Sequence, residues 1–293
     1  MDLTQYLSAR QKQVEAALDA SLPPAKTKPP RLHEALRYSI FAGGKRLRPI
    51  LLLAAAEACG GDSREALPAA CAVECLHTYS LIHDDLPCMD DDDLRRGKPT
   101  SHVVYGEGLA VLAGDALLTL SFELLAQSRG WERYNHATLV LELARAAGSK
   151  RLIAGQAADL EGEGQALDSD ELLFIHRNKT GALLTSCLRL GGMCANAHPD
   201  ELEALTEFGN DLGLAFQIID DILDVTQSAE MLGKTAGKDA AAQKHTFPAV
   251  FGLEESRARA VQLTDSAMAA LHLFGENGTA LRLLAEYLLK REF

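Results

Sequence analysis

Two runs of aspartates are the residues in this chain most able to do chemistry. The first, DDLPCMDDDDLRRG at Asp84–Gly97, places six carboxylates among its first ten residues. Like charges this crowded repel one another unless water or cations neutralise them. A solvated acidic loop is one interpretation. The apolar residues that lead into the run, and Arg95 and Arg96 that follow it, favour a metal-bridged anion.

The second run, FQIIDDILDV, covers Phe216–Val225. On a helix its polar side chains share one arc of about 100°, and these are Gln217, Asp220, Asp221 and Asp224. Burying three unpaired carboxylates would cost many kcal/mol, so something must neutralise them. Mg²⁺ typically takes one or two carboxylates, several waters and substrate phosphate oxygens. A solvent-facing acidic stripe is the alternative, and the hydrophobic flanks argue against it.

Basic residues gather beside glycines in three places. These are Lys45, Arg46 and Arg48; Arg95, Arg96 and Lys98; and Lys234 and Lys238. Aspartates that bind metal and arginines that bind phosphate together predict a site for a diphosphate ester. The sequence has no GxxxxGK[ST] loop and no GxGxxG after a strand, so a nucleotide-binding fold is not supported. An apolar diphosphate is therefore the expected ligand.

Helices must position these residues, because apolar side chains recur every three or four positions and alternating β-branched stretches are few. The expected helices are Leu3–Ala20, Arg31–Phe41, Pro49–Cys59, Glu65–Met89, Leu109–Gln127, His136–Ala147, Lys150–Leu160, Ser169–Cys194, Pro199–Val225, Phe247–Leu253, Glu255–Phe274 and Gly278–Lys290. The proline-rich piece Leu22–Pro30 is too short for a domain linker. The pattern predicts a single all-α domain over residues 1–293, a helical bundle around a central apolar cavity.

Composition narrows the class of protein. The chain has 293 residues, is 47% hydrophobic and carries a net charge of −12. An acidic surface disfavours nucleic acid. We expect no apolar run close to the roughly 20 residues that a membrane span needs. The first twenty residues lack the apolar core of a secretion signal. The six cysteines form no CxxC pair and are expected in the core. We expect a cytoplasmic protein.

Five motifs in order resemble the trans-prenyl diphosphate synthase family, most nearly its bacterial farnesyl diphosphate synthases. They are GGKRLRP at Gly43–Pro49, the two aspartate runs, HRNKTGALL at His176–Leu184, and the GK of Gly233 and Lys234. The resemblance covers nearly the whole chain. It implies a Mg²⁺-dependent prenyltransferase that condenses isopentenyl diphosphate with dimethylallyl or geranyl diphosphate to give farnesyl diphosphate. Geranyl or geranylgeranyl diphosphate, products of a different length, is the alternative.

The resemblance also implies a role for individual residues. Three Mg²⁺ ions, or Mn²⁺ in their place, would be held by Asp84, Asp85, Asp90, Asp220, Asp221 and Asp224. The cations expected on the allylic diphosphate are Arg95, Lys179 and Lys234. Those expected on isopentenyl diphosphate are Lys45, Arg48, His77 and Arg96. Lys179, Thr180 and Gln217 would lie near the reacting carbons.

Product length is expected to depend on the residues just before the first aspartate run. Tyr79, five residues before Asp84, resembles the aromatic stop of farnesyl-producing members, although ideal helical geometry places Ser80 closer to the direction of Asp84. Pro87 and Cys88 look like the two-residue insertion of the bacterial type. We expect a fifteen-carbon product, and a lid formed by residues 226–246 that carries Lys234 onto the phosphates.

Two other classes of protein share part of this pattern. A class I terpene cyclase would have the first aspartate run but would not need GGKRLRP, and consumption of isopentenyl diphosphate separates it from a synthase. A non-catalytic partner subunit would be expected to have lost aspartates, and both triads are intact. The apolar segment Leu109–Gln127 favours a homodimer with a helical interface.

Overall fold

The chain folds into a bundle of α-helices, which confirms the all-α prediction. The computed structural model describes residues 1–165, 167–226 and 246–289. The helices are α1 (Leu3–Ser21), α2 (Pro30–Ile40), α3 (Leu47–Ala58), α4 (Leu67–Asp84), α5 (Ser101–Tyr105), α6 (Glu107–Ala126), α7 (His136–Ala147), α8 (Leu152–Glu161), α9 (Ser169–Ile175), α10 (Ala182–Cys194), α11 (Pro199–Thr226), α14 (Phe247–Phe251), α15 (Leu253–Ala270) and α16 (Thr279–Leu289), with a 3₁₀ segment at Leu271–Gly278.

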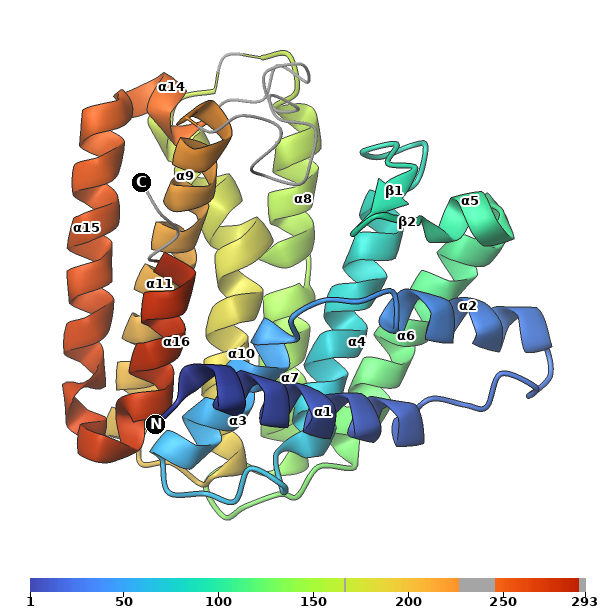
Figure 1. Ribbon diagram of the computed structural model, residues 1–293, viewed down its shortest axis with the longest axis horizontal. Coiled ribbons are helices and arrows are strands. Elements are labelled where there is room, and N and C mark those ends of the chain that lie inside the picture. Colours follow the sequence, from blue (N-terminus) through green and yellow to red (C-terminus); the bar gives the residue numbers. More distant parts are fainter. Residues whose placement is uncertain (166, 227–245, 290–293) are drawn as a thin grey trace.

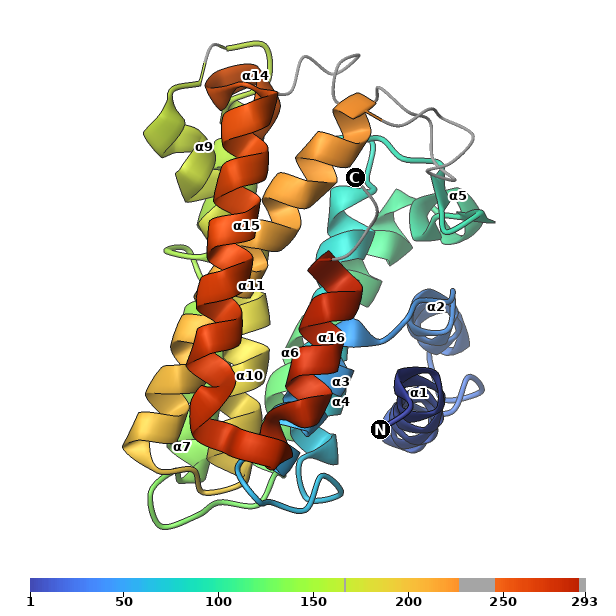
Figure 2. The same ribbon diagram turned by 60° about the vertical axis from the view of Figure 1, so that its left-hand side comes forward.

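Helix α10 forms the centre of the bundle. It packs against α3, α7 and α11, and the long helices stand side by side in Figure 1, with α1 and α2 crossing at one flank. Leu183 and Cys187 of α10 join the apolar cluster that includes α4 and α6, while Leu188 joins the cluster of α11 and α15. Figure 2 shows α15 lying along α11 on the outer side. The burial of apolar side chains on opposite faces of α10 therefore holds the two halves of the bundle together.

The expected helix Ser169–Cys194 is helical throughout, but a π-helical turn, His176–Gly181, interrupts it between α9 and α10. This turn is the HRNKTG sequence itself. Its wider geometry changes the directions of Lys179 and Thr180 from those of an ideal α-helix, and such turns occur frequently at functional sites.

The expected helix Glu65–Met89 is wrong at its C-terminal end, because α4 stops at Asp84. Pro87 has no N–H to donate and its ring disfavours a continuing helix. The chain folds back instead, and the backbone N–H of Asp90 donates to the carbonyl of Asp84 at 2.8 Å. This turn brings two widely spaced aspartates of the first run together.

A two-stranded hairpin follows, which the all-α reading of the sequence missed. Strand β1 (Leu94–Arg95) pairs antiparallel with β2 (Lys98–Pro99). Arg96 and Gly97 form the turn with positive φ angles of 54° and 74°, the conformation that suits a two-residue hairpin. The hairpin turns Arg95 back toward the end of α4.

The expectation that no segment is long and apolar enough to span a membrane is wrong for α6. By length and composition Glu107–Ala126 meets that criterion, and 39% of its most apolar window is buried. In the bundle this helix packs against α4 and α2.

Candidate active site

The two aspartate runs lie at the same end of the bundle. The first follows α4 and the second occupies the last turns of α11, and both helices point to the upper end in Figure 1. The π-helical turn and the C-terminal end of α8 lie at this end too. Four segments that are distant in sequence therefore contribute polar side chains to one region.

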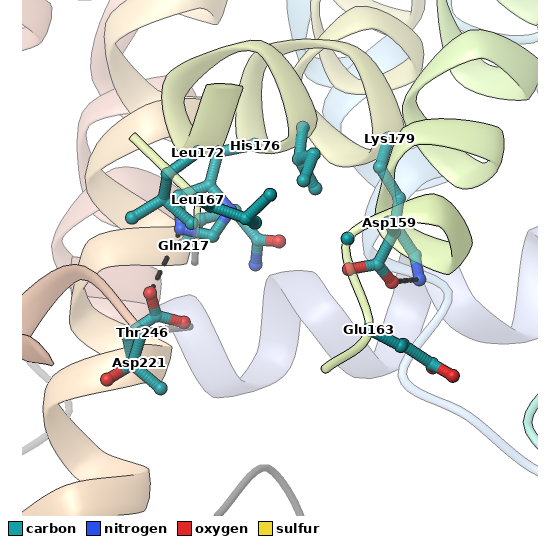
Figure 3. A pocket seen from close by; sticks show the side chains of 11 residues that line it. Asp159, Glu163, Leu167, Leu172, His176, Lys179, Gln217, Asp221 and Thr246 are labelled. Carbon is teal, nitrogen blue, oxygen red and sulfur yellow. Dashed lines mark hydrogen bonds and ion pairs between the residues drawn. The ribbon is translucent and has the colours of Figure 1, made fainter. Parts of the chain in front are cut away.

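A cavity of about 160 Å³ opens between α8, the π-helical turn and α11. Its walls include Lys179, Gln217 and Asp221, three residues for which the sequence predicts a role. Figure 3 shows their side chains around this cavity together with Asp159 and His176, which the sequence reasoning missed. Asp159 stands in no motif and only the fold reveals it, whereas His176 opens the HRNKTGALL motif, which was a sequence signal for it.

Lys179 is held by an aspartate from the neighbouring helix. Its Nζ donates to Asp159 Oδ2 at 2.5 Å, and both side chains are mostly buried. Asp159 lies on α8, twenty residues earlier in the chain. The carboxylate keeps the ammonium group at the cavity wall.

Asp221 of the second aspartate run is fixed by two donors. Its Oδ2 lies 2.9 Å from His176 Nε2 and accepts the backbone N–H of Phe247 at 2.7 Å. The π-helical turn, α11 and the start of α14 are thereby joined at one carboxylate. Asp220 and Asp224 lie on the same helix and are half-buried, as the predicted polar stripe requires.

Thr180 and Gln217 also meet. The hydroxyl of Thr180 donates to Gln217 Oε1 at 2.8 Å, across the contact between the π-helical turn and α11. Two residues predicted to lie near the reacting carbons are thus adjacent in the fold.

The first aspartate run is partly buried and crowded. The pKa of Asp84 is raised to about 6, mainly by burial; the carboxylates of Asp90 and Asp85 also raise it, while Lys179 and Arg95 lower it. The charge of Lys179 therefore acts on Asp84. The first aspartate run and the cavity that Lys179 lines thus belong to one region of the molecule.

Arg95 binds the first aspartate run directly. Its Nε donates to both carboxylate oxygens of Asp85, at 2.8 and 2.9 Å. Burial nevertheless raises the pKa of Asp85, against these hydrogen bonds. The structure thus pairs a predicted metal ligand with a predicted diphosphate ligand, and a bound diphosphate and its cations would have to replace this contact.

The predicted isopentenyl diphosphate residues form a second basic cluster. Arg48 Nη1 lies 3.3 Å from His77 Nε2, and Arg96 donates to the carbonyl of Gly43. Burial, followed by the charges of nearby arginines, moves the pKa of His77 well below its usual value. His77 is therefore neutral at pH 7 and adds no charge, and its Nε2 can accept from Arg48.

The GGKRLRP glycines make room for this cluster. At Gly44, where φ is +120°, a Cβ atom would lie 2.6 Å from Cζ of Arg96. A side chain at this position would displace the guanidinium, so the glycine permits Arg96 to lie against the loop.

Lys45 and Arg46 have partners of their own. Lys45 Nζ donates to the hydroxyl of Tyr287 on α16 at 2.8 Å. Arg46 is buried, where it donates to Glu74 Oε1 at 2.8 Å and to the carbonyl of Ile40 at 2.6 Å. Lys45 thus links the loop to α16 at the surface, and Arg46 anchors the loop to α4.

Tyr79 and Ser80 lie on different sides of α4. Tyr79 is buried and packs edge-to-face on His83, with ring centroids 5.5 Å apart. Ser80 is half-buried and donates to the carbonyl of His77 at 2.9 Å. Tyr79 is the one packed within the apolar core below the first aspartate run.

Some predicted residues lie outside the described part of the chain. They are Lys234, for which a diphosphate contact is expected, and nearly all of the expected lid at residues 226–246.

The carboxylates fit a hard divalent cation. Within the described residues no three His, Cys, Asp or Glu side chains are gathered closely enough to hold a metal ion by themselves. Mg²⁺ does not need such a set, since it commonly takes one or two carboxylates and completes its shell with water and phosphate oxygens. The crowded carboxylates of Asp85, which is buried, and of Asp84 and Asp90, which are half-buried, are the oxygen donors that this chemistry requires.

Comparisons with known proteins identify the family of the chain. The chain is 48% identical to the Arabidopsis thaliana heterodimeric geranylgeranyl pyrophosphate synthase large subunit 1, over 99% of this chain and 80% of that protein. It is 48% identical to a geranylgeranyl pyrophosphate synthase of Capsicum annuum, over 98% and 78%. An FPP/GFPP synthase structure from Zymomonas mobilis matches with a TM-score of 0.85 and 37% identity, over 98% of each chain. The polyprenyl synthetase family model matches residues 29–271, and the chain belongs to that family of prenyltransferases.

Proposed function

We propose that the chain condenses isopentenyl diphosphate with an allylic diphosphate, with Mg²⁺ bound at the two aspartate runs. The observation that carries this proposal is the cavity where Lys179, Gln217 and Asp221 meet, close enough to the first run for Lys179 to act on the pKa of Asp84. Family membership supports the same reaction class.

The allylic diphosphate would bind between the aspartate runs. Asp84, Asp85 and Asp90 would hold Mg²⁺ on one side, and Asp220, Asp221 and Asp224 on the other. The bound ions supply positive charge that stabilises the departing diphosphate. Lys179 adds a fixed cation at the cavity wall, because Asp159 prevents it from swinging away.

Isopentenyl diphosphate would bind at the second basic cluster. Arg48 and Arg96 bind its diphosphate, and neutral His77 accepts a hydrogen bond that orients Arg48. With both substrates fixed, the double bond lies beside the allylic carbon, and this positioning supplies much of the rate. Thr180 and Gln217 orient each other next to the reacting carbons.

For the product we propose geranylgeranyl diphosphate, the alternative to the fifteen-carbon prediction. The support is the name shared by the two plant relatives at 48% identity. Farnesyl diphosphate is the second candidate, and one observation favours it. The buried ring of Tyr79 lies under the first aspartate run, where a growing chain of isoprene units would meet it.

We further propose a homodimer in the cytoplasm. Four large apolar side chains are exposed along α5 and the start of α6, namely Val103, Val104, Val111 and Leu112. An exposed apolar patch of this kind on adjoining helices is typical of a subunit interface. The acidic composition of the chain supports a soluble compartment.

One assay tests the reaction and its product. Purified protein is given geranyl diphosphate, labelled isopentenyl diphosphate and Mg²⁺, and the products are separated by length. A twenty-carbon product supports the main proposal and a fifteen-carbon product the second candidate. No incorporation of label with any allylic diphosphate would reject both.

A variant tests the role of Tyr79. If its ring limits the chain, Tyr79→Ala lengthens the main product by at least one five-carbon unit, because the ring no longer blocks the space below the first aspartate run. Ser80→Ala is the matched control on the same turn of α4 and should leave the length unchanged. An unchanged product from Tyr79→Ala would show that the ring is not the stop.

A further inference from the structure

A second cavity lies beside α10, apart from the aspartate runs. Its volume is about 870 Å³, and its walls come from the last turns of α7, residues 148–151, α10, α11 and α15. None of the residues predicted for prenyl transfer lines it. Residues 148–151, which line it, join α7 to α8 in the ribbon of Figure 1.

The walls of this cavity are positively charged although the chain is acidic. Five cationic side chains line it, against two carboxylates, and the chain as a whole carries −12. The cations are Arg145, Lys150, Arg151, Arg177 and Arg189, and the carboxylates are Glu142 and Asp211. A concave surface with an excess of three positive charges concentrates anions from solution.

Most of these cations have no partner within the described part of the chain. Glu142 accepts from Arg189 Nε at 2.9 Å, and Asp211 accepts from the hydroxyl of Ser266 at 2.6 Å. Among the described residues, no hydrogen bond or ion pair holds Arg145, Lys150 or Arg177. Three exposed cations therefore line one cavity, and no carboxylate of the described residues is paired with them.

A buried hydroxyl in the wall also lacks a partner. Ser186 is 1% exposed, and its Oγ makes no hydrogen bond within the described part of the chain. Leaving such a group unsatisfied costs about 1–3 kcal/mol. Ser186 belongs to the wall of the cavity, but its Oγ is covered by neighbouring atoms, so the cationic side chains are the groups that a bound molecule can reach.

We propose that this cavity is a second binding site, for a small anion that carries phosphate groups. Guanidinium and ammonium groups are the usual protein ligands of phosphate. Leu214 and Leu263 line the same cavity, so the anion can carry an apolar portion as well. The volume is within the range of small-molecule sites.

The site adjoins the segment that carries Lys179 and Thr180. Gly181, the last residue of the π-helical turn, lines the cavity. Arg151 Nη1 lies 3.4 Å from Asn178 Oδ1 in the same turn. A ligand bound here therefore contacts the element that positions the candidate active site, from the opposite side. The proposal does not depend on the reaction proposed above.

Calorimetric titration of the full chain with inorganic diphosphate in excess EDTA tests the site, because EDTA removes the metal-dependent binding expected at the aspartate runs. Every protein in the comparison also carries Arg48→Gln, which removes the metal-independent diphosphate binding expected at the second basic cluster. We expect saturable binding. Arg145→Gln combined with Lys150→Gln should weaken it at least tenfold. The control, Lys12→Gln combined with Arg31→Gln, removes the same charge from the exposed surfaces of α1 and α2 and should bind like the unchanged protein.

The outcomes separate the possible origins of binding. No saturable binding, or equal binding by both double variants, overturns the proposal, since the diphosphate would then bind elsewhere or not at all. A repeat with geranyl diphosphate shows whether the apolar wall contributes to binding. An affinity equal to that of inorganic diphosphate supports recognition of phosphate alone. Tighter binding that is lost in the Arg145→Gln, Lys150→Gln protein supports a prenyl ester as the ligand. An unchanged thermal unfolding midpoint of the Arg145→Gln, Lys150→Gln protein shows that this variant is folded.

Discussion

The charged side chains of the candidate site are held by protein neighbours before any substrate is bound. Lys179 is held by Asp159, Arg95 by Asp85 and Arg96 by a backbone carbonyl. Such contacts keep each cation near the place where negative charge is expected, so little reorganisation remains for the reaction. None of these pairings is visible in the sequence, because each joins residues ten or more positions apart.

Arg46 and Glu74 form a buried ion pair that supports this arrangement, with side chains 1% and 3% exposed. We expect Glu74→Ala to destabilise the fold by about 3–5 kcal/mol, since it leaves the buried guanidinium of Arg46 with only the half-exposed carboxylate of Glu15, 3.7 Å away, as counter-charge. Chemical denaturation measures the change. Asp62→Ala breaks an exposed pair with Arg64 and should leave the midpoint unchanged. If the two substitutions lowered the free energy of unfolding equally, burial of the Arg46–Glu74 pair would not explain its contribution to stability.

At the scale of secondary structure, the π-helical turn joins the parts of the site. His176 contacts Asp221, Lys179 contacts Asp159 and Thr180 contacts Gln217. The sequence predicts a helix here because the apolar period continues through it, and the period carries no sign of a wider turn. The early end of α4 was missed for a similar reason, since helical apolar spacing persists as far as Pro87.

Substitution of His176 tests whether the π-helical turn positions Asp221 of the second aspartate run. We expect His176→Ala to raise the Mg²⁺ concentration needed for half-maximal activity by about 10–100-fold, because Asp221 loses the donor that orients it. His176→Gln, which keeps an N–H donor, should recover part of the loss. The control is His136→Ala at an exposed position on α7. An unchanged Mg²⁺ dependence of His176→Ala would contradict the assignment.

Gly155 permits α8 to approach the π-helical turn. A Cβ at this position would overlap the backbone nitrogen of Lys179. We expect Gly155→Ala to destabilise the protein by about 1–3 kcal/mol through overpacking and to lower prenyl transfer, measured by thermal unfolding and label incorporation.

Gly108→Ala is the matched control, since nothing lies within 4 Å of a Cβ there. It should be neutral or slightly stabilising, because alanine favours helix. A Gly155→Ala protein as stable and active as this control would show that the close approach is not needed.

At the scale of the whole molecule, periodicity predicts the bundle well because nearly every helix buries an apolar stripe. The short hairpin at Leu94–Pro99 was not predictable, since two-residue strands show no alternation. The sequence placed the site at the aspartate runs, and the fold brings Lys179, Gln217 and Asp221 to one cavity. The length of the product and the subunit contacts depend on the shape of cavities and surfaces, which periodicity does not describe.

Leu112 tests the proposed dimer. Its side chain is 54% exposed on α6, and we expect Leu112→Glu to yield a monomer in light scattering, because a carboxylate would be buried at the interface. Leu273→Glu is the control, with similar exposure of 56% in the 3₁₀ segment after α15, and should remain dimeric. A dimer in both variants would place the interface elsewhere.

The most direct measurement is a crystal structure of the protein with Mg²⁺ and a non-cleavable allylic thiolodiphosphate. We expect one diphosphate between α4 and α11, joined through Mg²⁺ to carboxylates of both aspartate runs and contacted by Lys179. A diphosphate bound elsewhere, or ions held by only one of the two runs, would contradict it.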